Sequence, residues 1–345
     1  EHSDLDQFEN LVEQTSFGLT TLPRDRNLLE QRIRDSRRSF ESRAVKPGGE
    51  TYLFVMEDLE AGKVVGTCGI SSKIGGYEPH YAYRIETTVH ESTNINVVKE
   101  IRSLHLVREH SGPSEVGSLF ILPDCRKGGL GRLLSLSRFM FMAEFSERFE
   151  PAVIAEMRGV VDETGHSPFW EALGRHFFDI DFPQADYHSM KDKRFIAELM
   201  PHHPIYIVLL DPEAQKVIGE VHPATRPALR MLEEEGLRFN GMVDIFEAGP
   251  ILSSPVEKVR TVRESKKAIV TGVTDEDISS GDCILTNTAL DFRAVLGAFA
   301  QDSEGGVRIS KKIASALNVK AGDGIRFAPL RPGKKKAPIE IESLD

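Results

Sequence analysis

The segment from Leu119 to Met142 most constrains the fold, because it predicts a strand, a basic glycine-rich loop and a helix in direct succession. The apolar run Leu119–Leu122 ends at Pro123, and the helix is expected over residues 132–147. Glycines let the backbone approach a ligand closely, and the first N–H groups of a helix attract an anion. The residues expected to meet that anion are Arg126, Lys127, Gly128, Gly129, Gly131 and Arg132. The alternative is an ordinary helix start with glycines in its turn.

The spacing of the loop residues distinguishes this motif from other phosphate-binding motifs. The sequence contains neither Gly-x-x-x-x-Gly-Lys-Ser/Thr, as in a P-loop, nor Gly-x-Gly-x-x-Gly in this loop, as in a dinucleotide fold. Arg126, Gly129 and Gly131 form Arg-x-x-Gly-x-Gly, which resembles the pyrophosphate loop of GNAT-type N-acetyltransferases. The resemblance implies an acyl-CoA site. The strand backbone at Leu119 could then pair with the pantetheine amides of CoA.

A second acetyltransferase feature follows at the expected distance. A strand is predicted over residues 152–157, and a helix begins at Pro168 and ends at Gly174. The two motifs at this spacing favour an α+β fold that is acetyltransferase-like (GNAT), with a mixed sheet flanked by helices. The helix and strand expected within Pro227–Phe239 and Met242–Phe246 suggest a duplication, although a plain amphipathic helix capped by glycine gives the same pattern.

Changes in composition predict four segments. Residues 1–180 are expected to form the GNAT-like acyl-CoA-binding domain, and residues 181–250 a second GNAT-like half that carries His222. Short β-prone pieces predict a small β-rich region over residues 251–331, and residues 332–345 a flexible charged tail. The remaining strands are expected over 52–58, 63–70, 81–90, 104–109, 268–273, 283–286, 292–299, 307–310 and 325–330, and a further helix over 27–42.

The overall composition excludes several classes of function. The 345 residues carry a formal net charge of −10, which argues against a nucleic-acid partner and is compatible with a cationic small substrate. No apolar run has the length of a membrane span. Cys68, Cys125 and Cys283 lie far apart without a Cys-x-x-Cys pair, which argues against a disulfide framework and a zinc site. We expect a cytoplasmic protein with no metal, no nucleic-acid partner and no membrane partner.

The resemblance is more specific than the fold. Segments from the N-terminus to about Pro250 resemble the arginine N-succinyltransferase family, and the β-rich region is similar in outline. These segments are Gly18–Pro23, Ser135–Ala143, Ala155–Gly159, Ser167–Trp170, Ala197–Pro201, His203–Tyr206 and Val221–Pro223.

Membership of this family implies transfer of succinyl from succinyl-CoA to the α-amino group of L-arginine, in the succinyl pathway of arginine breakdown. Succinyl-CoA is then a substrate, and no permanently bound cofactor is implied. Some members act on ornithine, and some pair two homologous chains, so we expect a homo-oligomer or a pairing with a homologous chain. The complete glycine loop favours a CoA-binding, active subunit.

Amide formation from an amine and a thioester needs a base for the amine, donors for the oxyanion and a proton for the CoA thiolate. Trp170 stands where acetyltransferases use a tyrosine to protonate sulfur, and an indole cannot give up a proton near neutrality. His222 is the expected proton donor, because imidazole titrates at about pH 6.5 and the family resemblance gives this role to the histidine of Val-His-Pro. The alternative is that His222 only caps the helix after Pro223. The family also implies that Leu119 contacts succinyl-CoA.

The pocket for the amino acid is less well defined by the sequence. A guanidinium requires carboxylates, and substrate carboxylates require arginine or lysine. The candidates are Glu86, Glu115, Glu156 and Asp244 for the first, and Arg84 and Arg158 for the second; each is otherwise a surface charge or an ion pair. The alternative functions are a related CoA-dependent N-acyltransferase acting on ornithine or another amine, and a non-catalytic GNAT-like binding subunit.

Overall fold

The computed structural model describes residues 2–15, 21–276, 278 and 282–333. These residues form two compact units, which divide between Val262 and Arg263. Residues 18–20 of the family-like segment Gly18–Pro23 lie outside the described residues, as does most of the predicted tail, residues 334–345.

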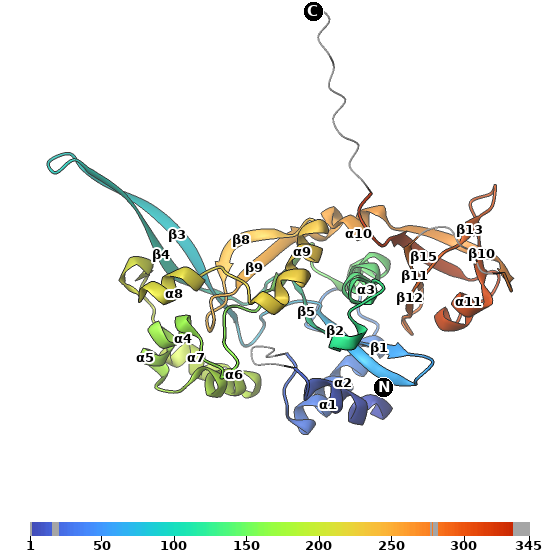
Figure 1. The fold of residues 1–345 in the computed structure, drawn as a ribbon, viewed down its shortest axis with the longest axis horizontal. Helices are drawn as coiled ribbons and strands as arrows, with labels where there is room; N and C mark the ends of the chain where they lie inside the picture. Colours follow the sequence, from blue (N-terminus) through green and yellow to red (C-terminus); the bar gives the residue numbers. More distant parts are fainter. Residues whose placement is uncertain (1, 16–20, 277, 279–281, 334–345) are drawn as a thin grey trace, which may run out of the picture. The chain divides into compact units, whose positions relative to one another are not determined.

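The first unit is built on a nine-stranded sheet with the order β1-β2-β5-β6-β9-β8-β3-β4-β7 (Figure 1). Its strands are β1 Thr51–Asp58, β2 Lys63–Ser71, β3 His80–Ser92, β4 Val97–Glu109, β5 Ser114–Ile121, β6 Ala152–Glu156, β7 Ile205–Tyr206, β8 Arg238–Val243 and β9 Pro250–Pro255. Strands β5 and β6 run parallel, whereas the other described neighbours run antiparallel. The predicted α+β class with a mixed sheet is therefore confirmed.

Helices cover this sheet and connect its strands. The α-helices are α1 Leu5–Val12, α2 Arg26–Glu41, α3 Leu130–Glu144, α4 Pro168–Ala172, α5 Gly174–Phe178, α6 Phe182–Lys191, α7 Arg194–Leu199, α8 Pro212–Val217, α9 Arg226–Glu234 and α10 Arg260–Glu264, the last of which crosses the unit boundary. Single 3-10 turns are η1 His2–Asp4, η2 Pro123–Cys125, η3 Ser146–Arg148, η4 Ile207–Leu209, η5 Pro223–Thr225 and η6 Val256–Lys258. None of the helices that the structure describes has the length and apolar character to cross a membrane.

Two apolar clusters hold the helices on the two halves of the sheet. In the first, Phe8 of α1 and Leu29 of α2 pack with Phe120 of β5. In the second, Trp170 packs with Tyr83 of β3 and with Phe246. Burying each of these side chains contributes about 1.5–3 kcal/mol, so the clusters fix how the helices lie over the strands.

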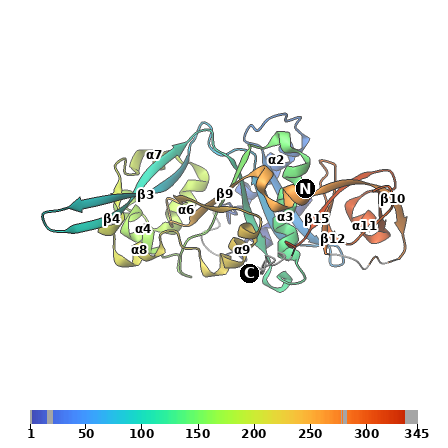
Figure 2. The same ribbon diagram turned by 90° about the horizontal axis from the view of Figure 1, so that it is seen from above.

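Strands β3 and β4 form a long hairpin that extends beyond the helices α4 and α8 of the same unit in both views (Figures 1 and 2). The strands pair from His80 with Glu109 to Ser92 with Val97. The sequence predicts only residues 104–109 of β4, because the outer part is solvent-exposed and its apolar residues, such as Val97 and Val98, form no buried face.

The second unit is a small six-stranded sheet with the order β12-β11-β15-β10-β14-β13. Its elements are β10 Lys266–Thr274, β11 Cys283–Asn287, β12 Ala294–Gly297, β13 Ala300–Gln301, β14 Val307–Ser310, α11 Lys311–Leu317 and β15 Gly324–Pro329. A cluster around Val270, Leu285 and Leu317 forms its core. The β-rich C-terminal region is thus present as predicted.

Two predicted domain boundaries differ from the structure. The first unit extends to Val262 and not to residue 250, because β9 pairs with both β6 and β8 in the same sheet. Residues 181–250 likewise belong to this unit and not to a separate compact body. The division into two GNAT-like halves stays a proposal.

The other two differences lie beside the site. Gly174 begins α5 instead of ending a helix, because Trp170 packs against it; a Cβ at Gly174 would lie 2.2 Å from the indole. The strand predicted over Met242–Phe246 ends at Val243, because the Asp244 carboxylate accepts hydrogen bonds from the N–H groups of Phe246 and Glu247 and forms a turn.

Candidate active site

The parallel strands β5 and β6 separate and leave a cavity between them. Among the described residues they pair at Ser114 with Val153 and at Glu115 with Ile154, after which β5 continues along β2. Residues 115–119 and 155–158 line a cavity of about 130 Å³. The edge of β5 that faces β6 therefore has main-chain groups available to the amides of an extended ligand.

A bulge in β5 lies at the cavity. Between its pairs with Thr67 and Gly69 of β2, β5 contains one extra residue. Ser118 there has a φ of 53°, in the left-handed region. Leu119 lines the cavity and also packs against the apolar cluster of Cys68, Ile121 and Leu134. Its contact with succinyl-CoA stays a prediction.

The glycine loop leads directly into the first turn of α3. Gly128 and Gly129 have φ values of 62° and 83°, which side chains rarely adopt. A Cβ at Gly131 would meet nothing within 4 Å, so the loop is open at this position. The first N–H groups of this 15-residue helix have no intrahelical acceptor and favour an anion. The structure thus has a glycine loop at a helix N-terminus, and its contact with a diphosphate stays a prediction.

The three cations of the loop have different surroundings. Arg126 is exposed and donates from Nε to the carbonyl oxygen of Ile121 at 3.1 Å, and Lys127 is exposed. The Nη1 atom of Arg132 lies 2.7 Å from Oε2 of Glu234 on α9, and the Arg132 side chain is 15% exposed. Arg132 thus has an anionic partner already, which leaves Arg126 and Lys127 as the more accessible charges.

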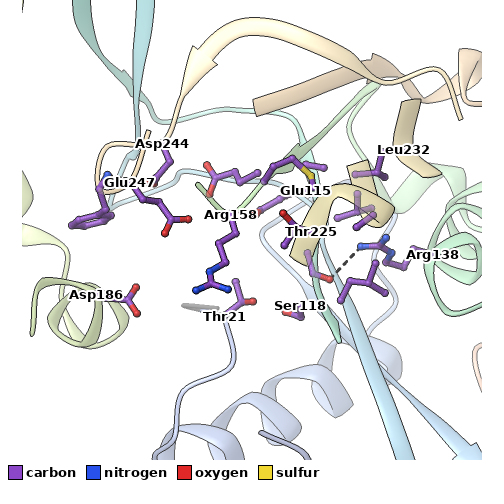
Figure 3. A pocket seen from close by; sticks show the side chains of 18 of the residues that line it. Thr21, Glu115, Ser118, Arg138, Arg158, Asp186, Thr225, Leu232, Asp244 and Glu247 are labelled. Atoms are coloured by element: carbon purple, nitrogen blue, oxygen red, sulfur yellow. Dashed lines mark hydrogen bonds between the residues drawn. The ribbon is translucent and has the colours of Figure 1, made fainter. Parts of the chain in front are cut away.

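The cavity between β5 and β6 is strongly acidic. Figure 3 shows side chains from β5, β6, α6, α9 and the β8–β9 turn converging on it. Its carboxylates are Glu115, Glu156, Asp186, Asp244 and Glu247, and its cations are Arg138 and Arg158. Arg138 is held by its own helix and by the carbonyl oxygen of Gly117 at 3.2 Å. A second cavity, of about 640 Å³, adjoins the first and shares Thr21, Glu156, Asp244 and Phe246 with it.

Burial and mutual repulsion change how these carboxylates titrate. Burial, with the charge of Glu156, raises the pKa of Glu115 to about 7. Burial raises the pKa of Asp186 to about 7, of Asp244 to about 6, and of Glu247 well above its usual range. These groups retain protons at a pH where surface carboxylates are ionised.

Glu156 behaves differently because it has a partner. Burial alone would raise the pKa of Glu156, but the charge of His80 and a hydrogen bond between Nε2 of His80 and Oε1 of Glu156 lower it overall. The charge of Glu156 and the same hydrogen bond raise the pKa of His80, although burial alone would lower it. The pairing therefore favours the ionised form of both His80 and Glu156.

His222 lies next to the cavity wall. Its N–H donates to the carbonyl oxygen of Arg158 at 2.9 Å, and Thr225, three residues later, lines the cavity. Nδ1 of His222 accepts a hydrogen bond from the N–H of Ala224 at 3.1 Å and caps η5. The sequence offers this capping role as the alternative to proton transfer. Burial and the charge of Arg158 lower the pKa of His222, so the imidazole is neutral near pH 7.

Trp170 cannot supply a proton. It is fully buried, and its indole Nε1 donates to the carbonyl oxygen of Ile180 at 3.0 Å. It packs against Phe178 and Phe246 and has a structural role. A proton donor for sulfur must therefore come from another element.

Only some of the substrate-binding residues that the sequence predicts lie at the cavity. Glu115, Glu156, Asp244 and Arg158 line the cavity. Arg84 and Glu86 face one another on β3, half-exposed, and belong to neither cavity. Asp186 and Glu247 were missed, since the sequence of α6 marks Asp186 only as a polar helix residue. The Gly-Pro turn that follows Glu247 is the one signal that could have drawn attention to that residue.

A parallel strand pair that separates at an open edge, a glycine loop at a helix N-terminus and a buried acidic cavity together define an acetyltransferase-like acyltransferase. Comparison with known proteins agrees. Residues 1–261 match the family model for the arginine N-succinyltransferase beta subunit, and residues 266–329 the model for the C-terminal domain of that subunit.

Full-length relatives give the same result. The chain is 44% identical to arginine N-succinyltransferase of Enterobacter sp. (strain 638) and 42% identical to that of Escherichia coli (strain 55989 / EAEC), each over 98% of both chains. The solved structure of arginine/ornithine succinyltransferase subunit AI from Pseudomonas aeruginosa matches with a TM-score of 0.87 and 33% identity, over 96% of this chain and 97% of that one. The chain belongs to the arginine N-succinyltransferase family, and the resemblance seen in the sequence is confirmed.

Proposed function

We propose that this protein transfers succinyl from succinyl-CoA to the α-amino group of L-arginine. The observation that carries the proposal is that β5, whose residues 115–119 line the acidic cavity, leads through the turn η2 into the glycine loop and α3. The named relatives, which are arginine N-succinyltransferases over their full length, support the same reaction. Ornithine is the second candidate acceptor, because the similar solved structure is described as an arginine/ornithine succinyltransferase.

The acyl donor is proposed to lie along β5. Its diphosphate would meet Gly128, Gly129, Gly131 and the cations at the start of α3. Its pantetheine amides would pair with the β6-facing edge of β5 beyond Glu115, near Leu119. The thioester then reaches the acidic cavity, where Arg158 is our candidate partner for the succinyl carboxylate.

The reaction moves two protons. The α-ammonium of arginine first loses one proton to a base, and we assign this step to Glu115, which lines the cavity at the last paired position of β5. The amine nitrogen attacks the thioester carbon and forms the C–N bond. When the C–S bond breaks, the nitrogen loses a second proton, which reaches the CoA thiolate by way of His222. A neutral imidazole can take that proton up and then donate it.

The enzyme assay follows the release of the CoA thiol, with N-succinylarginine identified by mass spectrometry. We expect turnover with succinyl-CoA and arginine, weaker turnover with acetyl-CoA, and product that carries succinyl on the α-nitrogen. A preference for acetyl-CoA would refute the acyl assignment. No CoA release with arginine, ornithine or other amines would refute the catalytic assignment.

The role of His222 needs a matched pair of variants, because the residue also caps η5. Asparagine is a strong N-cap residue but cannot transfer a proton, whereas alanine removes both functions. If His222 relays the proton, His222→Asn and His222→Ala both lose about 10²–10⁴-fold in kcat. If His222 is only a cap, His222→Asn keeps near-normal turnover and His222→Ala alone is impaired.

We further propose that the protein works in the cytoplasm, where Cys68, Cys125 and Cys283, all free in the structure, stay reduced. A homo-oligomer, or a pairing with a homologous chain, is the proposed assembly. The family model and the similar solved structure are each described as a subunit. Sedimentation of the purified chain, alone and with cell extract from its host, measures this directly.

A further inference from the structure

Two buried carboxylate oxygens lack hydrogen-bond partners among the described residues. They are Oδ1 of Asp186 and Oε2 of Glu247. Asp186 is 8% exposed and Glu247 is 6% exposed, and both line the cavity between β5 and β6. A buried polar atom without a partner destabilises the fold, so such atoms are retained where a ligand or another function uses them.

The two carboxylates come from different elements and are held in place. Asp186 lies in the middle of α6, and Glu247 lies in the turn between β8 and β9. Oε1 of Glu247 accepts from the N–H of Gly159 at 2.7 Å, which leaves Oε2 for the cavity. Gly159 and Gly249 permit this approach, because a Cβ at either position would lie within 2.3 Å of a main-chain oxygen of the opposite segment.

These residues form one end of the cavity. Figure 3 shows Asp186, Asp244 and Glu247 on one side, and Ser118, Arg138 and Leu232 on the side of β5 and α3, with Arg158 between the two groups. The thioester of a donor bound along β5 would arrive from the second side. The first end is therefore the part of the cavity that the far end of an acceptor would reach.

The chemistry of this end favours a planar cation. Three carboxylates, Asp186, Asp244 and Glu247, lie there with one guanidinium, that of Arg158, which leaves two carboxylates in excess. The apolar rings of Phe182 and Phe246 line the same cavity and suit an alkyl chain or the face of a guanidinium. No group of three His, Cys, Asp or Glu side chains in the described part of the chain is arranged to hold a metal ion.

We propose that Asp186 and Glu247 bind the guanidinium of the acceptor amino acid and select arginine by its charge. The proposal rests on the proposed function, since it takes the α-amino group of the same molecule to be the nucleophile. A guanidinium has five N–H donors and can bridge carboxylates from two sides, which a single ammonium does less well. Burial raises the pKa values of Asp186 and Glu247, and a guanidinium bound between them would favour their ionised forms.

The experiment compares arginine with citrulline, which has nearly the same shape but carries an uncharged urea group. The variants are Asp186→Asn, Glu247→Gln and the double substitution, each nearly isosteric; Gln at 247 keeps the acceptor for Gly159. The controls are Asp211→Asn, an exposed residue whose side chain makes no capping bond, and Glu86→Gln on β3. Initial rates are measured at saturating succinyl-CoA, and arginine and citrulline binding by calorimetry.

The wild type is expected to prefer arginine over citrulline strongly. Each variant should lose about 10- to 100-fold in kcat/KM for arginine, mainly through KM, because a hydrogen bond to a charged group is removed. Its kcat/KM for citrulline should change less than threefold, and its KM for succinyl-CoA should stay the same. The controls should match the wild type.

If the variants match the controls, or lose arginine and citrulline turnover in parallel, the guanidinium assignment is wrong while the transferase activity stands. If the wild type shows no turnover, the proposed function fails and the binding data decide the guanidinium site. Arginine binding to the wild type that is lost in the variants supports the site. No arginine binding to the wild type, or equal binding to the wild type and the variants, overturns it. If the variants do not fold, equal binding of arginine and citrulline to the wild type overturns it, and binding of arginine alone supports it.

Discussion

Replacing Asp186 by Asn is expected to stabilise the first unit at alkaline pH. Burial and the charge of Asp244 raise the pKa of Asp186 from 3.8 to about 7, against a smaller opposite effect of Arg158. The folded protein therefore keeps the Asp186 proton up to about pH 7, whereas the unfolded chain loses it near pH 4. Stability falls as the pH rises through this window and stays lower above it. Asparagine cannot ionise and avoids this loss.

The size of the effect follows from the two pKa values. A difference of about three pH units corresponds to at most about 4 kcal/mol at a pH above both values. Water entry and side-chain relaxation around an ionised Asp186 recover part of this, so we expect the variant to gain about 1–3 kcal/mol at pH 8.5. At pH 4.5 the folded protein holds the proton already, and the gain should be about 1 kcal/mol or less.

Differential scanning calorimetry at pH 4.5 and pH 8.5 measures this change. For a unit of this size, each kcal/mol shifts the Tm by about 2–4 °C. The control is Asp211→Asn, whose exposed carboxylate should show no difference between the two pH values. An Asp186→Asn variant that gains as much at pH 4.5 as at pH 8.5, or that is less stable at pH 8.5, would refute the argument that ionisation of Asp186 opposes folding.

Three further predictions concern other parts of the molecule. Glu115→Gln should lower kcat by about 10²–10⁴-fold and remove the limb near pH 7 from the rate profile, whereas an unchanged profile would exclude Glu115 as the base. Gly131→Ala should raise the KM for succinyl-CoA with no loss in Tm, since a Cβ there would meet no heavy atom within 4 Å; unaltered KM would place the diphosphate elsewhere. Arg260→Met should destabilise the first unit by about 3–5 kcal/mol in denaturant unfolding, because it leaves Glu235 buried without the partner at 2.6 Å; Glu235→Gln in addition should restore part of the loss.

The local elements of this chain could be read from the sequence because their signals are local. The short apolar runs of β1 and β2, and the apolar run, proline and glycines from Leu119 to Gly131, each act within a few residues. The outer part of β4, from Val97 to Ser103, could not be read in this way, since it is mostly exposed and its apolar residues mark no buried face. The boundary at Val262 also depends on long-range pairing, here of β9 with β6 and β8.

The sequence by itself determined the α+β class, the family and the glycine loop that we propose for the acyl donor, and with the family the proposed roles of Leu119 and His222. Each depends on contiguous motifs, whose spacing sets the backbone conformation directly. Only the tertiary structure brought Asp186 of α6 and Glu247 of the β8–β9 turn into one cavity with Glu115 and Arg158. A carboxylate acquires a raised pKa and an unpaired oxygen through burial next to residues distant in the sequence, and no local pattern encodes that burial.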